Sequence, residues 1–318
     1  MRLSFGASRS RARGVASLVV LFLAAVLSGC AVAVPWRVAA DPASVFLRSD
    51  GRDTIVYFAL PGRELSDRME QGTLSSTLVL AALQRGDFCT AWLDGFRRAD
   101  CYDAWLCGGE GMGVCVLNAA GQLIAARPGP QDPPELAAWI DLVANRRSAL
   151  QKARAAVAAM PFSAAANYQL GCLSLELGCR IGTEAALLLA ADVGIADAWQ
   201  QLARLAVLSG QLEKARDYLA KAPDSAASAC TEGYLRFKER RHAEAVLVLS
   251  AALARPDLGL DRQRTLLFLA KALHETGAEI EAMRVLDSLI AEGTGSTFEG
   301  AARHTRNHIQ NPVQGHTH

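Results

Sequence analysis

The sequence predicts an α/β domain followed by an all-α region of helical repeats. Three observations support this fold class. Short runs rich in β-branched and aromatic residues, each ended by turn residues, lie between residues 54 and 126 and are typical of buried strands. From Asp141 onward the apolar pattern is almost wholly helical, and small residues recur in it at fixed spacings. The chain has 318 residues, 51% apolar and 20% charged, which is enough for two domains with packed cores.

The first 29 residues have the pattern of a secretory signal peptide. Four arginines precede Val15–Leu27, an uncharged run that is too short to cross a membrane. The run ends in Leu27-Ser28-Gly29-Cys30, which resembles the lipobox of bacterial lipoproteins. The resemblance implies cleavage before Cys30 and acylation of this residue, whose sulfur forms the thioether to the lipid. The alternative is an ordinary signal peptide followed by a chance cysteine.

The lipobox also implies a location. Acyl chains on Cys30 would hold the protein on a membrane, with residues 30–50 as the tether to the first folded domain. Ala31 stands where many lipoproteins of the inner membrane have a retaining aspartate. We therefore expect a lipid-anchored protein on the periplasmic face of a bacterial membrane, with the outer membrane favoured.

Residues 51–145 are predicted to form the α/β domain. Pro61-Gly62 ends a strand at 54–60, and Pro133-Pro134 opens a helix that continues to 160. Between them we expect a helix at 74–83, a strand at 88–93, a helix at 96–106 and a hairpin of strands at 114–117 and 122–126. This order of elements resembles a thioredoxin-like domain. In active members of that family a Cys-x-x-Cys motif follows the first core strand.

The chain departs from active thioredoxin-like proteins where redox chemistry would occur. No cysteine lies between Cys30 and Cys89, and no proline lies at 110–116, where the family has a cis-proline. Disulfide exchange needs a thiolate of low pKa with a second thiol beside it. We therefore expect a redox-inactive domain. The alternative is a thiol-disulfide oxidoreductase with a displaced dithiol at Cys107 and Cys115, on either side of a glycine-rich loop.

The remaining cysteines give few constraints. Seven are left besides Cys30, so at least one has no disulfide partner within the chain. Cys89 and Cys115 would lie on strands flanking the strand at 54–60 on opposite sides. Two strand spacings are about 9.6 Å, which is too far for a disulfide between them.

Residues 146–303 are predicted to be helical repeats. Aligned on Trp199, Ala229 and Leu266, three segments share a small residue four positions later and an alanine sixteen positions later. Small residues let two antiparallel helices approach closely, and large residues fill the gaps. The pattern resembles the tetratricopeptide repeat, with a degenerate earlier copy at 161–193 and a capping helix at 296–304. Related helical repeats remain an alternative because the spacing between copies is uneven.

In tetratricopeptide stacks the first helix of each repeat lines a concave groove. The resemblance places Arg204, Lys238 and Lys271 there as a basic track, with Gln200 and Tyr234 beside them. The other residues at groove positions are Asp197, Cys230, Arg264 and His274. A basic track would attract an acidic extended peptide or loop of a protein partner by charge complementarity. The alternative is that these are ordinary solvated charges.

Several function classes are not supported. A formal charge of +1 gives no basic footprint for nucleic acid. The sequence has no nucleophile elbow, HExxH zinc motif or phosphate-binding loop, so we expect no cofactor and no enzyme activity. His304 and His308 fall in a predicted polar tail, 304–318, rather than in a metal site. We expect a non-enzymatic interaction protein, with a subunit of a larger envelope complex as a second alternative.

Overall fold

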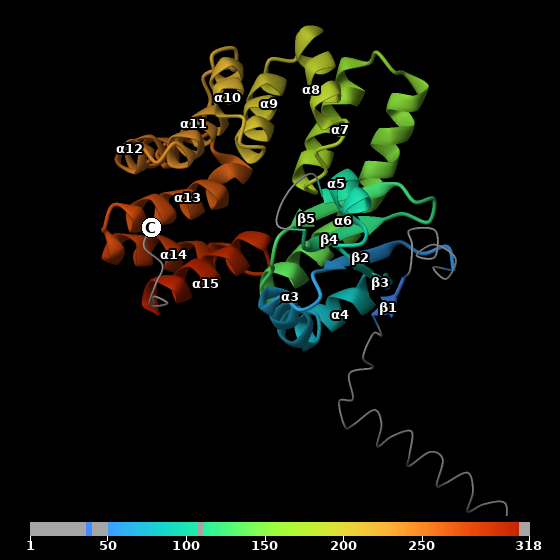
Figure 1. The fold of residues 1–318 in the computed structure, drawn as a ribbon. Helices are drawn as coiled ribbons and strands as arrows, with labels where there is room; N and C mark the ends of the chain where they lie inside the picture. Colours follow the sequence, from blue (N-terminus) through green and yellow to red (C-terminus); the bar gives the residue numbers. More distant parts are fainter. Residues whose placement is uncertain (1–35, 40–49, 107–110, 312–318) are drawn as a thin grey trace, which may run out of the picture.

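The computed structural model describes residues 36–39, 50–106 and 111–311. A mixed five-stranded sheet with helices comes first, and a series of packed helix pairs follows. Figure 1 shows the helices from α7 (Ala164–Glu176) to α15 (Thr297–Gln310) following an arc that starts and ends beside the α/β domain. The predicted division into an α/β region and an all-helical region is confirmed at this level.

The sheet has the strand order β1-β3-β2-β4-β5. The first three strands along the chain run parallel, whereas β4 is antiparallel to β2, and β5 to β4. The strands are β1 (Arg37–Val38), β2 (Thr54–Ala59), β3 (Cys89–Asp94), β4 (Gly113–Leu117) and β5 (Leu123–Pro128). Four of them lie where the sequence predicts a strand. β1 lies within the segment predicted to be a tether. The sequence does not predict this strand because it pairs with β3, which is distant in the chain, and has no local strand pattern.

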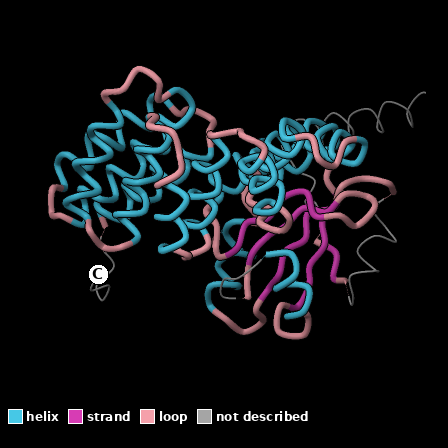
Figure 2. Tube along the Cα trace, turned by 90° about the horizontal axis from the view of Figure 1, so that it is seen from above, coloured by secondary structure: helices cyan, strands magenta, loops and turns pink. Residues whose placement is uncertain are grey.

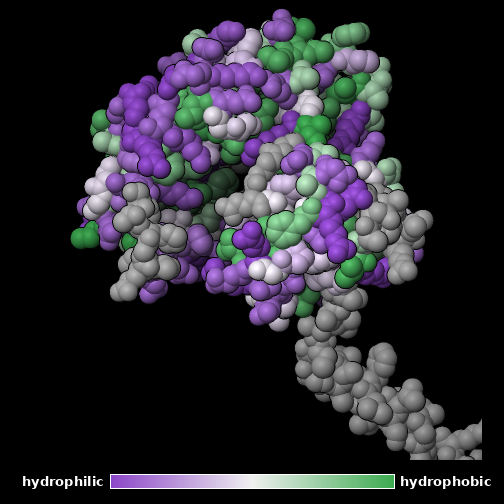
Figure 3. Space-filling view, viewed as in Figure 1, coloured by the Kyte–Doolittle hydropathy of each residue, from purple (hydrophilic) through white to green (hydrophobic). Residues whose placement is uncertain are grey.

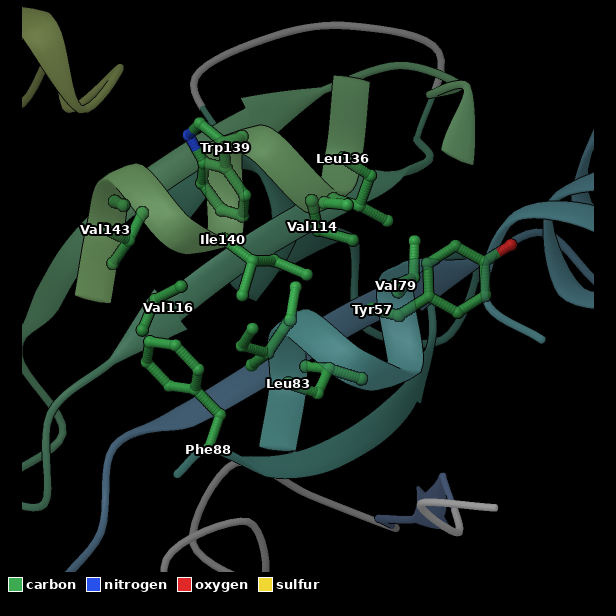
Figure 4. Packing of buried hydrophobic residues seen from close by; sticks show 14 of the residues in the cluster. Tyr57, Val79, Leu83, Phe88, Val114, Val116, Leu136, Trp139, Ile140 and Val143 are labelled. Atoms are coloured by element: carbon green, nitrogen blue, oxygen red, sulfur yellow. The ribbon is translucent and has the colours of Figure 1, made fainter. Parts of the chain in front are cut away.

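Helices cover both faces of the sheet. α4 (Thr77–Arg85) and α6 (Pro133–Ala159) pack on one face, and α5 (Ala99–Leu106) packs on the other. Figure 4 shows the first of these cores, where Tyr57, Leu83 and Ile140 come together from β2, α4 and α6. All six residues of β2 are buried, since both of its faces are covered.

The chain between β2 and α4 differs from the prediction. The structure has a short helix, α3 (Glu64–Arg68), and a π-helical turn (Met69–Thr73) where no regular element was predicted. α4 starts three residues after the predicted helix. Ser76 fixes this start, because its side-chain oxygen accepts a hydrogen bond from the backbone N–H of Leu78 at 3.3 Å.

Within the described residues, four helix pairs follow α6. They are α7 with α8 (Thr183–Asp192), α9 (Asp197–Leu208) with α10 (Leu212–Leu219), α11 (Ala226–Lys238) with α12 (His242–Leu253), and α13 (Arg262–Glu275) with α14 (Glu279–Glu292). A 3₁₀ turn, Gly259–Asp261, precedes α13. The three predicted repeats and the degenerate earlier copy each correspond to one helix pair.

Close contact between a small residue and a leucine joins the helices of a pair. A Cβ built on Gly171 would lie 2.5 Å from Leu187 Cδ2, and one on Gly233 would lie 2.5 Å from Leu249 Cδ2. Both glycines occupy the small-residue position of the aligned segments, and both leucines lie sixteen residues further on. The sequence spacing therefore reflects the contact that sets the distance between paired helices.

The last helix of the arc returns to the long helix α6, which precedes the arc in the chain. α15 packs on α6, and a Cβ on Gly300 would lie 2.8 Å from the Cα of Glu135. His304 on α15 forms an ion pair with Asp132, the residue immediately before α6. The helix continues to Gln310, so α15 includes His304, the last residue of the predicted capping helix, and also His308, beyond that predicted end.

The turn between α7 and α8 covers the edge strand β5. The Ala126 N–H donates to the Leu177 carbonyl at 3.1 Å, and Cys179 Sγ donates to the Ile124 carbonyl at 3.0 Å. Gly178 has a φ of +79°, and a Cβ there would lie 2.1 Å from the Ala126 carbonyl oxygen, so glycine is required. Figure 2 shows the sheet beside the stacked helices. The turn satisfies a sheet edge that would otherwise be open to another chain.

Candidate functional site

A cavity of about 280 Å³ lies where the helical arc meets the α/β domain. Strand β5, the turn after α7 and the helices α9, α11 and α13 contribute to its wall. Figure 3 shows this face of the molecule hollowed between the helices and the α/β domain. The cationic and aromatic residues in the lining are Arg127, Trp139, Arg180, Arg204, Tyr234, Arg264, Phe268 and Phe298. Both regions of the chain therefore build this site.

Two of the four arginines at the cavity are paired with a carboxylate. Arg127 on β5 forms an ion pair with Glu135 near the start of α6. Arg264 on α13 forms an ion pair with Asp261, three residues earlier, and its guanidinium carbon lies 5.8 Å from the centroid of the Phe298 ring. Burial lowers the pKa of Arg127 to about 10. The surroundings thus disfavour its positive charge even with Glu135 alongside.

The side chains of the other two, Arg180 and Arg204, make no hydrogen bond or ion pair with any residue in the described part of the chain. Glu176, a carboxylate in the cavity lining, pairs with Arg146 at 3.1 Å instead. Burial lowers the pKa of Arg204, and burial together with the nearby Arg204 charge lowers the pKa of Arg264. Since arginine stays protonated at ordinary pH, these shifts indicate a destabilised positive charge that an anion would relieve.

Tyr234 on α11 lies among these arginines. Its ring stacks on Phe268 of α13, with centroids 3.9 Å apart and planes at 17°. Burial raises the pKa of Tyr234 to about 12, while Arg180, Arg204 and Arg264 act in the opposite direction. Three guanidinium groups are therefore within electrostatic reach of the Tyr234 hydroxyl.

Lys238 and Lys271 extend the positive charge along the helices α9, α11 and α13, which we call the inner helices of the arc. Lys238 is exposed, one turn after Tyr234 on α11, and its Nζ lies 5.7 Å from the centroid of the Tyr234 ring. Lys271 on α13 is half-buried, and its pKa is lowered first by burial and then by the charge of Lys238. The structure thus brings the predicted residues Arg204, Tyr234, Lys238 and Lys271 to one inner surface.

Gln200 is placed differently from the other predicted groove residues. Its side chain is buried between α9 and α11, where Nε2 donates to Thr231 Oγ1 at 2.7 Å and to the Ala227 carbonyl at 3.3 Å. These hydrogen bonds join two neighbouring pairs of the arc. Gln200 therefore holds the groove in shape and does not present its amide to a partner.

Arg127 and Arg180 are cationic cavity residues that sequence reasoning missed. Arg127 lies on the last strand, and Arg180 lies in the turn that covers it, inside the degenerate copy at 161–193 but at no predicted groove position. Their proximity to Arg204 depends on how that turn packs on β5. No local pattern in the sequence carries this information.

Among the described residues, Cys89, Cys101 and Cys115 of the α/β domain are in no disulfide. Cys89 and Cys115 lie on β3 and β4, on opposite sides of β2, as predicted. Cys115 is fully buried, and burial raises its pKa well above the usual value, which disfavours the thiolate. Cys107, the other half of the alternative dithiol, and Cys30 lie outside the described residues.

The described part of the chain also bears on metal and membrane binding. It contains no group of three histidine, cysteine or acidic residues placed to hold a metal ion. His304, which was assigned to a polar tail, is engaged with Asp132. None of the described helices is both long and apolar enough to cross a membrane.

Comparison with models of protein families and with curated protein sequences finds no match to this chain.

Proposed function

We propose that this protein is a non-enzymatic binding protein whose inner helical surface captures an acidic segment of a protein partner. The observation that carries the proposal is the gathering of Arg204, Lys238 and Lys271 on one surface. No described carboxylate forms an ion pair with any of the three. Cations without an ion-pair partner are available to an incoming acidic chain, and complementary charge speeds and orients its docking.

We also infer that the two regions are thioredoxin-like and tetratricopeptide-like. The first inference is supported by the strand order, with β2 between a parallel and an antiparallel neighbour, and by the order of helices and strands along the chain. The second is supported by helix pairs that meet through a small residue and a leucine at a fixed spacing. In this interpretation the α/β domain serves as a structural partner of the arc.

The absence of redox chemistry is part of the same proposal. Leu60-Pro61-Gly62-Arg63 follows β2, where active thioredoxin-like proteins have their cysteines. The buried thiol of Cys115 is disfavoured as a nucleophile. These features support a domain that contributes surface and rigidity rather than disulfide exchange.

We place the protein on the periplasmic face of a bacterial membrane, anchored through Cys30, with the outer membrane favoured. Strand β1 begins seven positions after Cys30. A chain of that length spans about 25 Å at full extension. The α/β domain would therefore lie close to the lipid surface. Replacing Cys30 by alanine should abolish incorporation of labelled palmitate, and equal labelling of this variant would refute the anchor.

Charge reversal tests the binding surface. A variant with Arg204→Glu, Lys238→Glu and Lys271→Glu should bind a fluorescein-labelled glutamate-rich peptide more weakly than the wild type, as measured by anisotropy. The difference should be large at low salt and small at about 1 M salt, where the Debye length is about 3 Å. A lysine-rich peptide serves as the probe of opposite charge.

A matched control carries the same charge change elsewhere. Lys152→Glu, Lys221→Glu and Arg284→Glu alter three exposed residues that do not line the cavity. This control should bind the acidic peptide nearly as the wild type does, and both variants should keep the helical circular-dichroism signal. Equal binding by the inner-surface variant and the wild type at low salt would refute the proposal, as would a wild type that prefers the lysine-rich peptide.

A further inference from the structure

We propose that the cavity between β5 and the helices α9, α11 and α13 binds a small aromatic carboxylate, at a site that shares Arg204 and Tyr234 with the partner surface. The carboxylate group of the ligand would be held by Arg180 and Arg204, and its ring would lie against the wall formed by Tyr234 and Phe268. The site includes residues of the sheet edge and of the turn after α7, which are not part of the repeated inner surface. The ligand site therefore does not rest on capture of a protein partner, although Arg204 belongs to both surfaces.

The charges at the cavity favour one carboxylate. Arg127 and Arg264 already have ion-pair partners, and Glu176 is engaged by Arg146. This leaves the guanidinium groups of Arg180 and Arg204 without an ion pair among the described residues, and Glu176 acts on Arg204 only through its charge. A planar guanidinium matches a carboxylate with two parallel hydrogen bonds, so two such groups suit a single anion.

The aromatic wall favours a flat apolar body next to that charge. Tyr234 and Phe268 are stacked, and Trp139 and Phe298 complete the apolar lining. The Tyr234 hydroxyl, near three arginines, adds a polar contact at the charged end. Aromatic rings of a ligand would gain stacking or edge contacts that an aliphatic chain does not make.

The size of the cavity limits the ligand. Sites for drug-sized ligands occupy about 300–1,000 Å³, and this cavity, at about 280 Å³, lies just below that range. One ring with a short acidic chain fits this volume. Inorganic phosphate would use the arginines but would leave the aromatic wall without a contact.

Calorimetric titration of the whole folded chain with 3-phenylpropanoate tests the site. The matched probes are its neutral amide, which keeps the ring, and acetate and inorganic phosphate, which keep the charge. We expect the acid to bind at least about tenfold more tightly than each of the others, because the amide loses the charge-assisted hydrogen bonds and acetate and phosphate lose the contacts of the ring. Equal binding of the amide, or equal binding of phosphate, would overturn the proposal.

Variants assign the binding to this cavity. Arg204→Gln and Arg180→Gln should each weaken binding of 3-phenylpropanoate about tenfold or more. Arg262→Gln is the control. Arg262 is on the same helix as Arg264, but it does not line the cavity, and its Nε lies 2.9 Å from Glu292 Oε2. Unchanged affinity in both cavity variants would overturn the proposal, as would failure of the wild type to bind at about 10 mM ligand.

Two further measurements keep the result interpretable. Phe268→Leu should reduce the preference for 3-phenylpropanoate over butanoate, which tests the aromatic wall even if an arginine variant unfolds. Lys238→Glu combined with Lys271→Glu separates this site from the partner surface, because neither lysine lines the cavity. This variant should bind the glutamate-rich peptide more weakly and 3-phenylpropanoate within about twofold of the wild type, whereas an equal loss for both ligands would overturn the claim that the cavity is a site of its own.

Discussion

The α/β domain and the helical region bury their cores by different means. In the sheet, large side chains from distant segments meet, as Phe58 of β2 does with Tyr102 and Trp105 of α5. In the helix pairs, a glycine or alanine on one helix receives a leucine from the next, as Gly233 does with Leu249. The first core therefore depends on contacts across the domain, and the second depends mainly on neighbours in sequence.

This difference determines how each region should respond to change. A core built from distant segments loses contacts with several elements at once when one side chain is removed. A stack of helix pairs has a stability close to a sum of repeat and interface terms, so damage in one pair stays more local. Here the packing of α15 on α6 connects the last helix of the stack to the α/β domain, which limits that independence.

The largest expected effect is in the α/β core. Phe58 is fully buried, with its ring centroid 5.6 Å from that of Tyr102 and 5.9 Å from that of Trp105. Phe58→Ala should lower the free energy of unfolding by about 3–5 kcal/mol, because it removes a large apolar side chain and leaves a cavity. Guanidinium denaturation followed by circular dichroism measures this change.

Phe162→Ala is the matched control for that measurement. Phe162 is 84% exposed in the turn before α7. The same substitution there should change stability by no more than about 0.5 kcal/mol. A cost below about 1 kcal/mol for Phe58→Ala would contradict the description of a tightly packed sheet core.

The sequence predicts the elements of the fold better than the contacts between them. Runs such as Thr54–Ala59 and the small-residue spacing around Gly233 are local patterns, so their strands and helix pairs are predicted. The sequence does not predict strand β1 or the contact of Gly300 with Glu135, because each depends on a segment far away in sequence. These long-range contacts close both the sheet and the arc.

The candidate site divides in the same way. Arg204 and Tyr234 are predicted to share a surface because they occupy equivalent positions in successive repeats, and Lys238 follows Tyr234 by one helical turn. The structure brings the three together. Arg127 and Arg180 join the cavity only because the turn after α7 packs on β5. Gln200 occupies a groove position of the repeat, but its amide donates a hydrogen bond to Thr231 and is buried. Periodicity therefore places a residue on a helix face without determining which polar groups it meets.

An intermediate effect is expected in a helix pair. Gly233→Ala would place a Cβ 2.5 Å from both Leu249 Cγ and Leu249 Cδ2. Overpacking costs about 1–3 kcal/mol, which is offset in part by about 1 kcal/mol from the better helix propensity of alanine. We therefore expect a net loss of about 1–2 kcal/mol in the free energy of unfolding, measured by urea denaturation.

The control and the coupling test use other sites on the chain. A Cβ on Gly72 meets no atom within 4 Å, so Gly72→Ala should be neutral or slightly stabilising. Gly233→Ala combined with Leu249→Ala should cost less than the sum of the two single changes, because the leucine that clashes is removed. Strict additivity would mean that this contact does not set the helix spacing.

The smallest effect concerns the ion pair that closes the arc. The hydrogen bond to Asp132 raises the pKa of His304, outweighing burial and the charge of Lys271. The same bond lowers the pKa of Asp132. A histidine whose pKa is raised on folding contributes stability below its unfolded pKa of about 6.5, and this contribution is lost as pH rises through the folded pKa. The aspartate contributes above about pH 4 and loses its effect as pH falls through its own lowered pKa.

Closure by this pair should therefore be strongest between about pH 4 and 6.5. His304 is 63% exposed and Asp132 44% exposed, so solvent screening limits the effect. His304→Gln should lower the free energy of unfolding by no more than about 1 kcal/mol at pH near 5.5 and leave it unchanged at pH near 9. Asp132→Asn, which keeps a residue suited to cap α6, should remove the same pH dependence. Both variants should differ from the wild type less at high salt, and an equal loss for His304→Gln at the two pH values would show that its role is packing rather than charge.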